Sequence, residues 1–381
     1  MGSKREIINF IDESISELNV DSLWLCDLFA GSAIVGGSFR EKFSIHSNDI
    51  QAYSEILART YLSDLSHIKH SILDDIEIEA RNKVNEFKKK HARLVFPYSR
   101  TMGLEKFIKI EKSQQKLLSK NFGLGFHLFT QYYSGTYWSY EQCIWIDSLR
   151  AVAEQYKDQK KNGPVYYAIL SSLMFAMSYT SQSTGHYAQY RDATSESSMM
   201  DILSYRERDI WSYFERKFLE LLTIENSRMF EFKASTLDYL DCIRIIEPNT
   251  IVYADPPYQS VHYSRFYHAI ETLVKYDYPK VEYKGRYRED RHQSPFCKKT
   301  TIKEAFKSLF EGIRQKDSHL VLSYCDTGMI SLEEINSIAK KVFTNNYTSW
   351  VKEREHIHSK MGRSDVRNQE VTEYAILFKR R

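Results

Sequence analysis

The chain has 381 residues, of which 42% are hydrophobic and 27% charged, and its formal net charge is +3. This composition excludes a disordered or collagen-like chain. No apolar run reaches the roughly 20 residues that a membrane-spanning helix needs, so we expect a cytoplasmic protein without membrane contact. The five cysteines are scattered without zinc-finger spacing, and we expect reduced thiols and no metal.

The first part of the chain predicts alternating helices and strands. Apolar positions recur at helical spacing over residues 4–18. Apolar strands are expected at 23–29 and 43–47, the first followed by a glycine-containing turn at 30–33 and the second by a helix at 52–62. This alternation is the opening of a doubly wound α/β sheet.

The middle of the chain has a different pattern. Residues 66–234 are helix-like and polar, with the clearest buried helix at 165–179. Short apolar strands resume afterwards, at 250–254, 320–324 and 371–378. We therefore predict one α/β sheet domain, formed by residues 1–65 and 235–381, that is interrupted by a helical insertion.

Positive charge is concentrated in two stretches that also contain aromatic residues. Residues 81–120 hold twelve Lys or Arg and three Glu, and residues 275–303 hold nine Lys or Arg and four acids. Such patches are typical of proteins that bind a polyanion. In the first stretch we expect Lys88, Lys89 and Lys90 to contact phosphates, although a solvated helix face explains this run equally well.

The sharpest motif is Asp255-Pro256-Pro257-Tyr258, directly after an apolar strand. Ligands of α/β sheets bind at the carboxyl ends of strands. The loop offers the Asp255 carboxylate and the Pro256 carbonyl as fixed acceptors, and the Tyr258 ring as a stacking surface. This set suits an exocyclic NH₂ on a planar base, and a plain Pro-rich turn is the alternative interpretation.

A second motif is the strand-to-helix turn Asp27-Leu28-Phe29-Ala30-Gly31-Ser32-Ala33. A dinucleotide-binding turn would need GxGxxG, which is absent. Asp49 follows at the end of the next strand, where an acid accepts hydrogen bonds from ribose hydroxyls. A glycine turn and a ribose acid without a phosphate-binding loop favour S-adenosylmethionine as the ligand.

Together these motifs resemble those of the Dam-like DNA adenine methyltransferases. Three segments match in the order that the family shows: Met1-Gly2-Ser3-Lys4, Asp27 to Gly31, and the DPPY motif at 255–258. Weaker matches lie at 47–49, 322–324 and 358–363. One position departs from the family, since its second turn glycine is Ala33 here.

The resemblance implies a Rossmann-like, S-adenosylmethionine-dependent methyltransferase sheet that needs no metal. It also implies roles for individual residues. Lys4 and Asp27 would contact the methionine end of the cofactor, Phe29 and Gly31 would line its pocket, Asp49 would hold the ribose, and Asp238 would lie near the cofactor adenine. Asp255, Pro256, Pro257 and Tyr258 would form the catalytic loop, with Tyr258 stacked on an extruded base.

The resemblance places a target recognition domain in the insertion. A polar loop at 181–191 supplies side chains that read base edges, namely Gln182, His186, Gln189 and Arg191, although a plain helix-end loop fits as well. His262 and Arg265 follow the catalytic loop and are expected to lie over the target strand. His262 and His268 also have ligand-like spacing, but packing or phosphate contact is the preferred interpretation.

The function expected from the resemblance is methylation of the adenine amine in double-stranded DNA by a monomer. A role in restriction–modification or phage defence, with a cognate restriction endonuclease as partner, is implied by the resemblance alone. Three alternatives stay open. The same fold could act on the cytosine amine, it could methylate an RNA adenine or a protein glutamine amide, or the chain could be a non-catalytic DNA-binding protein.

Overall fold

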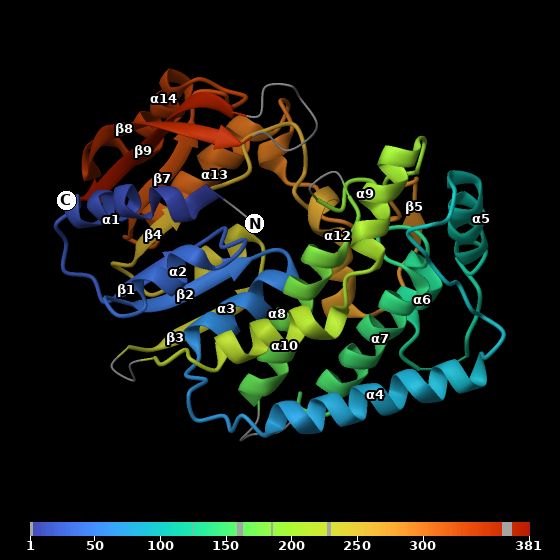
Figure 1. The fold of residues 1–381 in the computed structure, drawn as a ribbon. Helices are drawn as coiled ribbons and strands as arrows, with labels where there is room; N and C mark the ends of the chain where they lie inside the picture. Colours follow the sequence, from blue (N-terminus) through green and yellow to red (C-terminus); the bar gives the residue numbers. More distant parts are fainter. Residues whose placement is uncertain (1–2, 124, 158–162, 184–185, 227–229, 360–367) are drawn as a thin grey trace. The chain divides into compact units, whose positions relative to one another are not determined.

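The computed structural model describes residues 3–123, 125–157, 163–183, 186–226, 230–359 and 368–381. It divides into two compact units (Figure 1). The sheet unit contains Met1–Leu62, Asn226–Ser264 and His292–Arg381, and the helical unit contains Ser63–Glu225 and Arg265–Arg291. Among the described helices, none is both long and apolar enough to cross a membrane.

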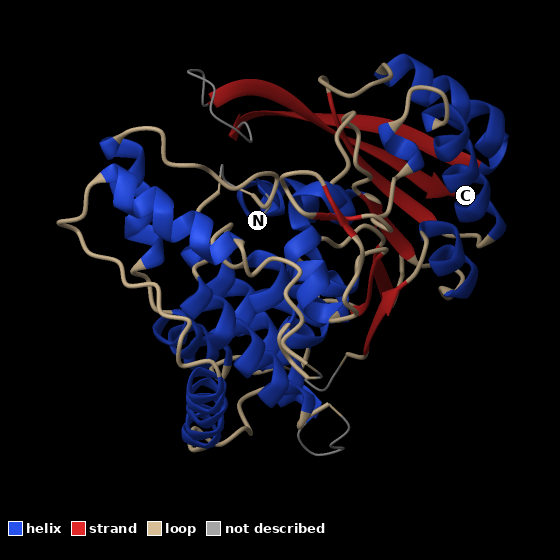
Figure 2. Ribbon diagram, turned by 90° about the vertical axis from the view of Figure 1, so that its right-hand side faces the viewer, coloured by secondary structure: helices blue, strands red, loops and turns tan. Residues whose placement is uncertain are grey.

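A seven-stranded sheet forms the centre of the sheet unit, drawn in red in Figure 2. In chain order its strands are β1 (Trp24–Asp27), β2 (Ser44–Asp49), β3 (Phe232–Thr236), β4 (Ile251–Ala254), β7 (His319–Cys325), β8 (Tyr347–Ser359) and β9 (Asn368–Arg380). Their order across the sheet is β3-β2-β1-β4-β7-β9-β8. The first five run parallel, and β9 is antiparallel to both of its neighbours.

Helices cover both faces of this sheet, which makes it doubly wound. They are η1 (Ser3–Ile7), α1 (Ile8–Glu17), α2 (Ile34–Phe39), α3 (Ala52–Leu62), α11 (Tyr239–Ile245), η2 (Pro295–Cys297), α13 (Ile302–Gln315), α14 (Leu332–Phe343) and η3 (Thr344–Asn346). The helices α11, α13 and α14 pack on one face, in a core that also contains Cys26, Leu28 and Val252. The helices α1, α2 and α3 lie on the other face (Figure 1).

The sequence explains these packing choices. The strands β4 and β7 are buried along their whole length, as expected for central strands that are covered on both faces. The helix α13 buries a stripe at helical spacing, which includes Ile302, Phe306 and Leu309. The order of the strands reverses between β1 and β4, because β2 and β3 lie to one side and β7 to the other. Ligands of such sheets bind at this switch point.

The helical unit contains most of the insertion. Its helices are α4 (Ile72–Lys90), α5 (Leu104–Gln115), α6 (Leu128–Tyr133), α7 (Tyr140–Glu154), α8 (Gly163–Thr180), α9 (Glu196–Arg206), α10 (Ile210–Leu221) and nearly all of α12 (Ser264–Lys275). A short hairpin joins β5 (Val281–Glu282) to β6 (Tyr287–Arg288). The helix α8 is almost entirely buried and packs against α7 and α10.

The predicted α/β class and the mostly parallel sheet are confirmed. The helix expected at 4–18 is divided into η1 and α1, and the strand expected at 23–29 is shortened to β1. The strands β3 and β8 were not expected. The helical unit also contains residues 265–291, which the sequence predicted to be part of the sheet domain.

Candidate active site

Three aspartates lie at the carboxyl ends of three neighbouring strands. Asp27 ends β1, Asp49 ends β2, and Asp255 directly follows β4. Because β1 lies between β2 and β4 in the sheet, the parallel register brings these ends together. The predicted carboxylates therefore meet at the switch point of the sheet, where a ligand of such a fold binds.

The turn after β1 is held by Asp49. Its two carboxylate oxygens each accept a backbone hydrogen bond at 2.9 Å, one from Gly31 and one from Gln51. Gly31 has φ +51° and Ala33 has φ +58°, a left-handed conformation that favours glycine. The backbone at Ala33 is thus in a conformation that glycine adopts at no steric cost.

Asn48 is a second organiser of this turn, and sequence reasoning gave it no role. Its side-chain amide donates to the carbonyls of Leu28 (3.3 Å) and Leu237 (3.1 Å). Its Oδ1 accepts from Ser235 Oγ (2.7 Å) and from the Leu237 amide (3.2 Å). Asn48 therefore ties the ends of β1 and β3 together. The available signal was a polar residue that ends a buried strand.

Asp27 is buried but weakly satisfied. Its Oδ2 accepts one long hydrogen bond, 3.3 Å from the Gly36 amide of α2. Burial raises the pKa of Asp27 to about 7, and the charges of Asp255 and Asp49 act in the same direction. A carboxylate in this position favours a nearby positive charge.

Lys4 brings the start of the chain into the site. Its Nζ lies 3.1 Å from Asp255 Oδ1 and 3.8 Å from Glu373, and it donates to Ser323 Oγ at 3.0 Å. Burial alone would lower the pKa of Lys4, but the charges of Asp255, Tyr253 and Glu373 and the hydrogen bond to Asp255 together outweigh it, so the pKa is raised. Lys4 is therefore a fixed cation that holds one of the two oxygens of Asp255.

Glu373 is a site residue that sequence reasoning missed. Its side chain is only 1% exposed, and neither carboxylate oxygen has a hydrogen-bond partner among the described residues. Burial raises the pKa of Glu373 to about 7, although Lys4 opposes this shift. The signal was an acid in a last predicted strand that is otherwise uncharged, and its contacts depend on the pairing of β9 with β7.

Aromatic side chains border the site. The Phe29 ring stacks on Tyr239 with centroids 5.9 Å apart and meets Phe296 edge-on. Tyr258 is 9% exposed and packs edge-on against Tyr324 at 5.3 Å. Its predicted stacking on a base therefore stays a prediction.

The other predicted residues near the cofactor are also placed. Pro256 is buried and Pro257 half-buried. Asp238 caps α11, where its Oδ1 accepts from the Leu240 amide at 3.0 Å. In the N-terminal motif Met1 and Gly2 lie outside the described residues, as do residues 360–363 of the closing segment.

Two of the predicted base-reading residues are used inside the helical unit. Gln182 is fully buried, and its amide donates to the carbonyls of Thr136 (2.6 Å) and Arg191 (3.0 Å) while accepting from the Arg191 amide. The Arg191 side chain is 14% exposed and forms an ion pair with Asp201. The assignment of Gln182 as a base reader is therefore wrong in this structure, because its side-chain amide is hydrogen-bonded to Arg191 of its own loop and to Thr136.

The remaining predicted DNA contacts differ in exposure. Gln189 is exposed, whereas His186 is half-buried against Phe266 and Tyr267, and burial lowers its pKa to about 4. Residues 184 and 185 of this loop lie outside the described residues. His262 is half-buried in the sheet unit.

The predicted basic contacts and His268 can also be placed. In the helical unit Lys88 pairs with Glu141 at the end of α4, while Lys89 and Lys90 are exposed. Arg265 donates to the Tyr287 hydroxyl at 3.1 Å. His268 is buried, with Nε2 2.8 Å from the Tyr187 carbonyl, so the preferred packing interpretation of this histidine holds.

The chemistry of the sheet-unit site follows from its donors and acceptors. Asp27 and Glu373 are buried acids with few hydrogen bonds, and such groups favour a cationic ligand. Asp49 and Gly31 shape a turn without a phosphate cradle. Asp255 offers an oxygen beyond the one held by Lys4. The arrangement suits a ligand with positive charge and sugar hydroxyls beside a substrate that donates hydrogen bonds.

The chain was compared with known protein families. The family described as D12 class N6 adenine-specific DNA methyltransferase matches residues 1–338. This range includes the N-terminal motif, the turn after β1 and the DPPY loop.

Individual relatives are distant in sequence. Modification methylase LlaI of Lactococcus lactis subsp. lactis is 21% identical over 369 residues, which are 92% of this chain and 51% of the relative. Type II methyltransferase M.FokI of Planomicrobium okeanokoites is 26% identical over 347 residues, 89% of this chain and 46% of the relative. Type II methyltransferase M.NlaIII of Neisseria lactamica is 24% identical over 347 residues, 90% of this chain and 87% of the relative. The chain thus spans about half the length of the first two relatives.

Proposed function

Since the chain belongs to the D12 class of N6 adenine-specific DNA methyltransferases, we propose that it transfers a methyl group from S-adenosylmethionine to the exocyclic amine of adenine in double-stranded DNA. The observation that carries this proposal is the catalytic loop. Asp255 follows β4 at the switch point, and Lys4 fixes its Oδ1 at 3.1 Å. The second oxygen is then available to a substrate that donates hydrogen bonds.

The donor set fits S-adenosylmethionine, which carries an ammonium and a sulfonium charge. Glu373 supports this fit, because its buried oxygens have no hydrogen-bond partner among the described residues. When bound, the cofactor supplies an electrophilic methyl group on sulfur. Its holding residues would be Lys4 and Asp27 at the methionine end, Phe29 and Gly31 along the pocket, Asp49 at the ribose and Asp238 near the adenine.

Asp255 and the Pro256 carbonyl would orient the target amine. Each accepts a hydrogen bond from one N–H of the amine, which aims the nitrogen lone pair at the methyl group and leaves that lone pair less conjugated with the ring. In-line displacement at a methyl group depends mainly on such positioning. Asp255 Oδ2 then accepts the proton that the methylated nitrogen releases. No step in this scheme needs a metal ion.

The target base must leave the duplex before its amine can reach a buried methyl donor. We assign the reading of DNA sequence to the helical unit, with Gln189 and His186 as candidate base contacts and Lys89 and Lys90 as candidate phosphate contacts. One DPPY motif per chain supports a monomer. The relatives called modification methylases support a restriction–modification role with a cognate endonuclease.

The direct test is chemical. Unmethylated DNA is incubated with the protein and S-adenosylmethionine, digested to nucleosides and analysed by mass spectrometry. We expect N6-methyl-2′-deoxyadenosine with the wild type and at least about a 100-fold loss with Asp255→Ala, since one oriented acceptor at a reacting atom has an effect of this size. Asp255→Asn tests whether the charge or only an acceptor is needed.

A matched control separates this effect from general damage. Asp241→Ala removes an exposed aspartate of the same unit, and activity should stay at the wild-type level. Methyl groups on cytosine would show that cytosine, not adenine, is the target base. Methyl groups on neither base would reject the proposal for DNA. Full activity of Asp255→Ala would reject the assigned catalytic loop.

A further inference from the structure

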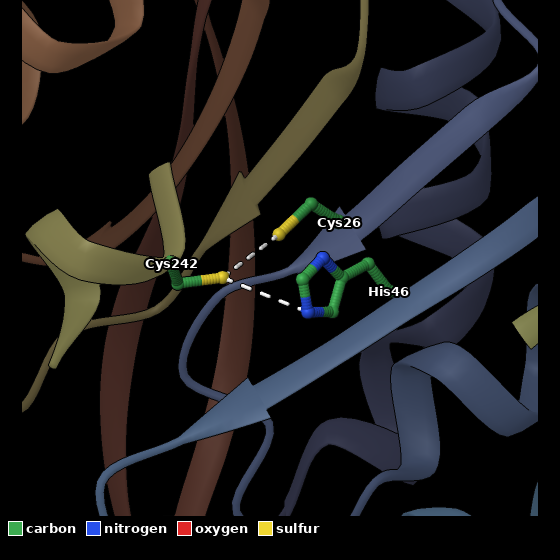
Figure 3. A group of neighbouring side chains, drawn as sticks. All are labelled: Cys26, His46 and Cys242. Atoms are coloured by element: carbon green, nitrogen blue, oxygen red, sulfur yellow. Dashed lines mark hydrogen bonds between the residues drawn. The ribbon is translucent and has the colours of Figure 1, made fainter. Parts of the chain in front are cut away.

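Three side chains that could bind a metal ion meet inside the sheet unit. Cys26 on β1 and His46 on β2 are register partners in adjacent parallel strands, so their side chains lie on the same face of the sheet. Cys242 lies on α11, which packs on this face. Figure 3 shows its sulfur directed toward Cys26 and the His46 ring. All three are buried.

Two of the distances are close to those of a tetrahedral metal site. Cys242 Sγ lies 3.9 Å from Cys26 Sγ and 4.0 Å from His46 Nε2, and the three ligand atoms lie within 4.8 Å of one another. With Zn–S bonds of about 2.3 Å and Zn–N bonds of about 2.0 Å, the ligand atoms of a tetrahedral zinc ion lie roughly 3.5–3.8 Å apart. The two distances from Cys242 need shifts of a few tenths of an ångström, and the Cys26–His46 distance needs a shift of up to roughly 1.3 Å.

The Ser235 hydroxyl lies beside these three side chains and is the candidate fourth ligand. Ser235 Oγ on β3 lies 2.9 Å from His46 Nε2 and donates its proton to Asn48 Oδ1. Because this hydroxyl gives its one proton to Asn48, it accepts a hydrogen bond from His46 Nε2–H, and a metal ion would have to replace the proton on Nε2. Ligand atoms that are fixed by a further hydrogen bond are common in metal sites.

Charge and softness select the metal. Two thiolates and a neutral imidazole around a divalent ion carry no net charge, which suits a fully buried position. Thiolate and imidazole ligands favour Zn²⁺ over Mg²⁺ or Ca²⁺. The alternative is a cluster of weak thiol hydrogen bonds among buried side chains.

We propose that Cys26, His46 and Cys242, with the Ser235 hydroxyl, bind one thiophilic divalent ion such as Zn²⁺. The site is structural, because its three ligand side chains are buried and leave little access for a substrate. Its ligands come from four segments of the sequence, so no spacing motif reveals it. The inference is independent of the proposed methyl transfer.

The site has a consequence for the neighbouring pocket. Cys26 directly precedes Asp27, and His46 lies three residues before Asp49. Cys242 is in the helix that Asp238 caps. A bound ion would therefore join the three segments that carry these acids, and its binding free energy would add to the stability of the sheet unit.

The test uses the full chain, reduced and freed of metal with a chelator under argon. Co²⁺ is titrated in, and absorption is recorded for thiolate-to-cobalt charge transfer and the intense visible bands of tetrahedral Co²⁺. We expect saturation at one Co²⁺ per chain and loss of the bands when Zn²⁺ is added. Zn²⁺ at a large excess over its Kd should raise the melting temperature by roughly 5–10 °C.

Two variants locate the site. Cys242→Ser keeps the size of the side chain but removes a thiolate, and the Co²⁺ affinity should fall roughly 100-fold or more. Cys143→Ser, a change to a buried cysteine of the helical unit, should leave the titration unchanged.

The wild-type titration decides the proposal even if a variant fails to fold. Absence of tetrahedral Co²⁺ bands in the reduced wild type would overturn it. So would a Cys242→Ser variant that retains them. A Cys26–Cys242 disulfide in air, with no metal uptake after reduction, would identify the pair as a redox centre instead.

Discussion

Two buried aspartates, one in each unit, show how the same burial serves different purposes. Asp27 in the sheet unit and Asp147 in the helical unit are both 2% exposed. Burial raises the pKa of each to about 7. They differ in their hydrogen bonds. Asp27 accepts one bond of 3.3 Å from a backbone amide, whereas Asp147 accepts four of 2.5–2.8 Å.

The four donors to Asp147 come from the start of α6 and from beyond α12. They are the amides of Phe129 and Thr130, the Thr130 hydroxyl and the Tyr276 hydroxyl. This carboxylate therefore organises its own unit and has little capacity left for a ligand. Asp27 instead lies beside other acids at a strand end. A buried acid indicates a ligand site when its hydrogen bonds are few and its neighbours repel it.

The largest expected effect is on stability, from Asp147→Ala. The change leaves buried amide and hydroxyl donors without an acceptor, and each costs about 1–3 kcal/mol, so we expect a loss of about 4 kcal/mol or more. Urea unfolding followed by circular dichroism measures it. Asp209→Ala is the graded control, since it removes only an exposed helix cap of α10, at a cost of about 1 kcal/mol. Equal losses in both variants would contradict the role given to Asp147.

The second effect is on ligand affinity, from Asp27→Asn. The variant removes a charge that we assign to the methionine end of S-adenosylmethionine. Hydrogen bonds to charged groups contribute about 1.5–3 kcal/mol, so the Kd should rise roughly 10- to 100-fold in calorimetry. The melting temperature should not fall, because the change relieves a buried and weakly satisfied acid. An unchanged Kd, or a large loss of stability, would show that Asp27, like Asp147, stabilises the fold and does not bind the ligand.

The dependence on pH separates affinity from stability. In the folded chain without cofactor Asp27 holds its proton up to about pH 7, whereas in the unfolded chain it releases it near 3.8. The stabilisation from this proton is complete below about pH 3.8 and is lost as the pH rises through 7. Cofactor affinity runs the other way, because a cation binds the ionised form.

We therefore expect S-adenosylmethionine affinity to weaken as the pH falls from about 8 to 6. The Asp27→Asn variant should show a flatter profile, to which Glu373 still contributes. Asp147→Asn, if it folds, should keep the profile of the wild type. Calorimetry at several pH values makes the comparison, and a wild-type profile that is flat below pH 7 would contradict it.

The smallest effect concerns lysines at the end of α4. Lys88 pairs with Glu141, whereas Lys89 and Lys90 are exposed. If these two contact phosphates, replacing both by Ala should lower the salt slope of DNA binding by about 2. Lys88→Ala should change it less. Identical slopes for all three proteins would make the run a solvated helix face.

Much of the sheet unit could be predicted, because its signals are local. The apolar runs that became β4 and β7 are buried on both faces, and β1 ends in a turn with a left-handed glycine. The edge strand β8 was missed because Lys352, Glu353, Arg354 and Glu355 make its middle strongly charged. A strand at the edge of a sheet tolerates such residues, and they protect it from further pairing.

The parts of the site that escaped prediction depend on contacts distant in sequence. Glu373 is recognised as a site residue through its ion pair with Lys4. Asn48 is recognised through its hydrogen bonds with Leu237 and Ser235. Gln182 was assigned to DNA because it lies in a polar loop, but its side-chain amide is hydrogen-bonded to Thr136 and Arg191. Residues 265–291 join the helical unit through packing of α12, which no local pattern encodes.

Lys4 and Ser323 are 319 positions apart in the sequence, so their contact can form only late in the synthesis of the chain. A ribosome that adds about 5–20 residues per second needs roughly 15–60 s to travel between them. Until β7 has emerged, Lys4 lacks Ser323, and until β9 has emerged it lacks Glu373. An unfinished chain therefore has an incomplete charge network at its candidate site, so nascent chains should be inactive even after the DPPY loop has left the ribosome.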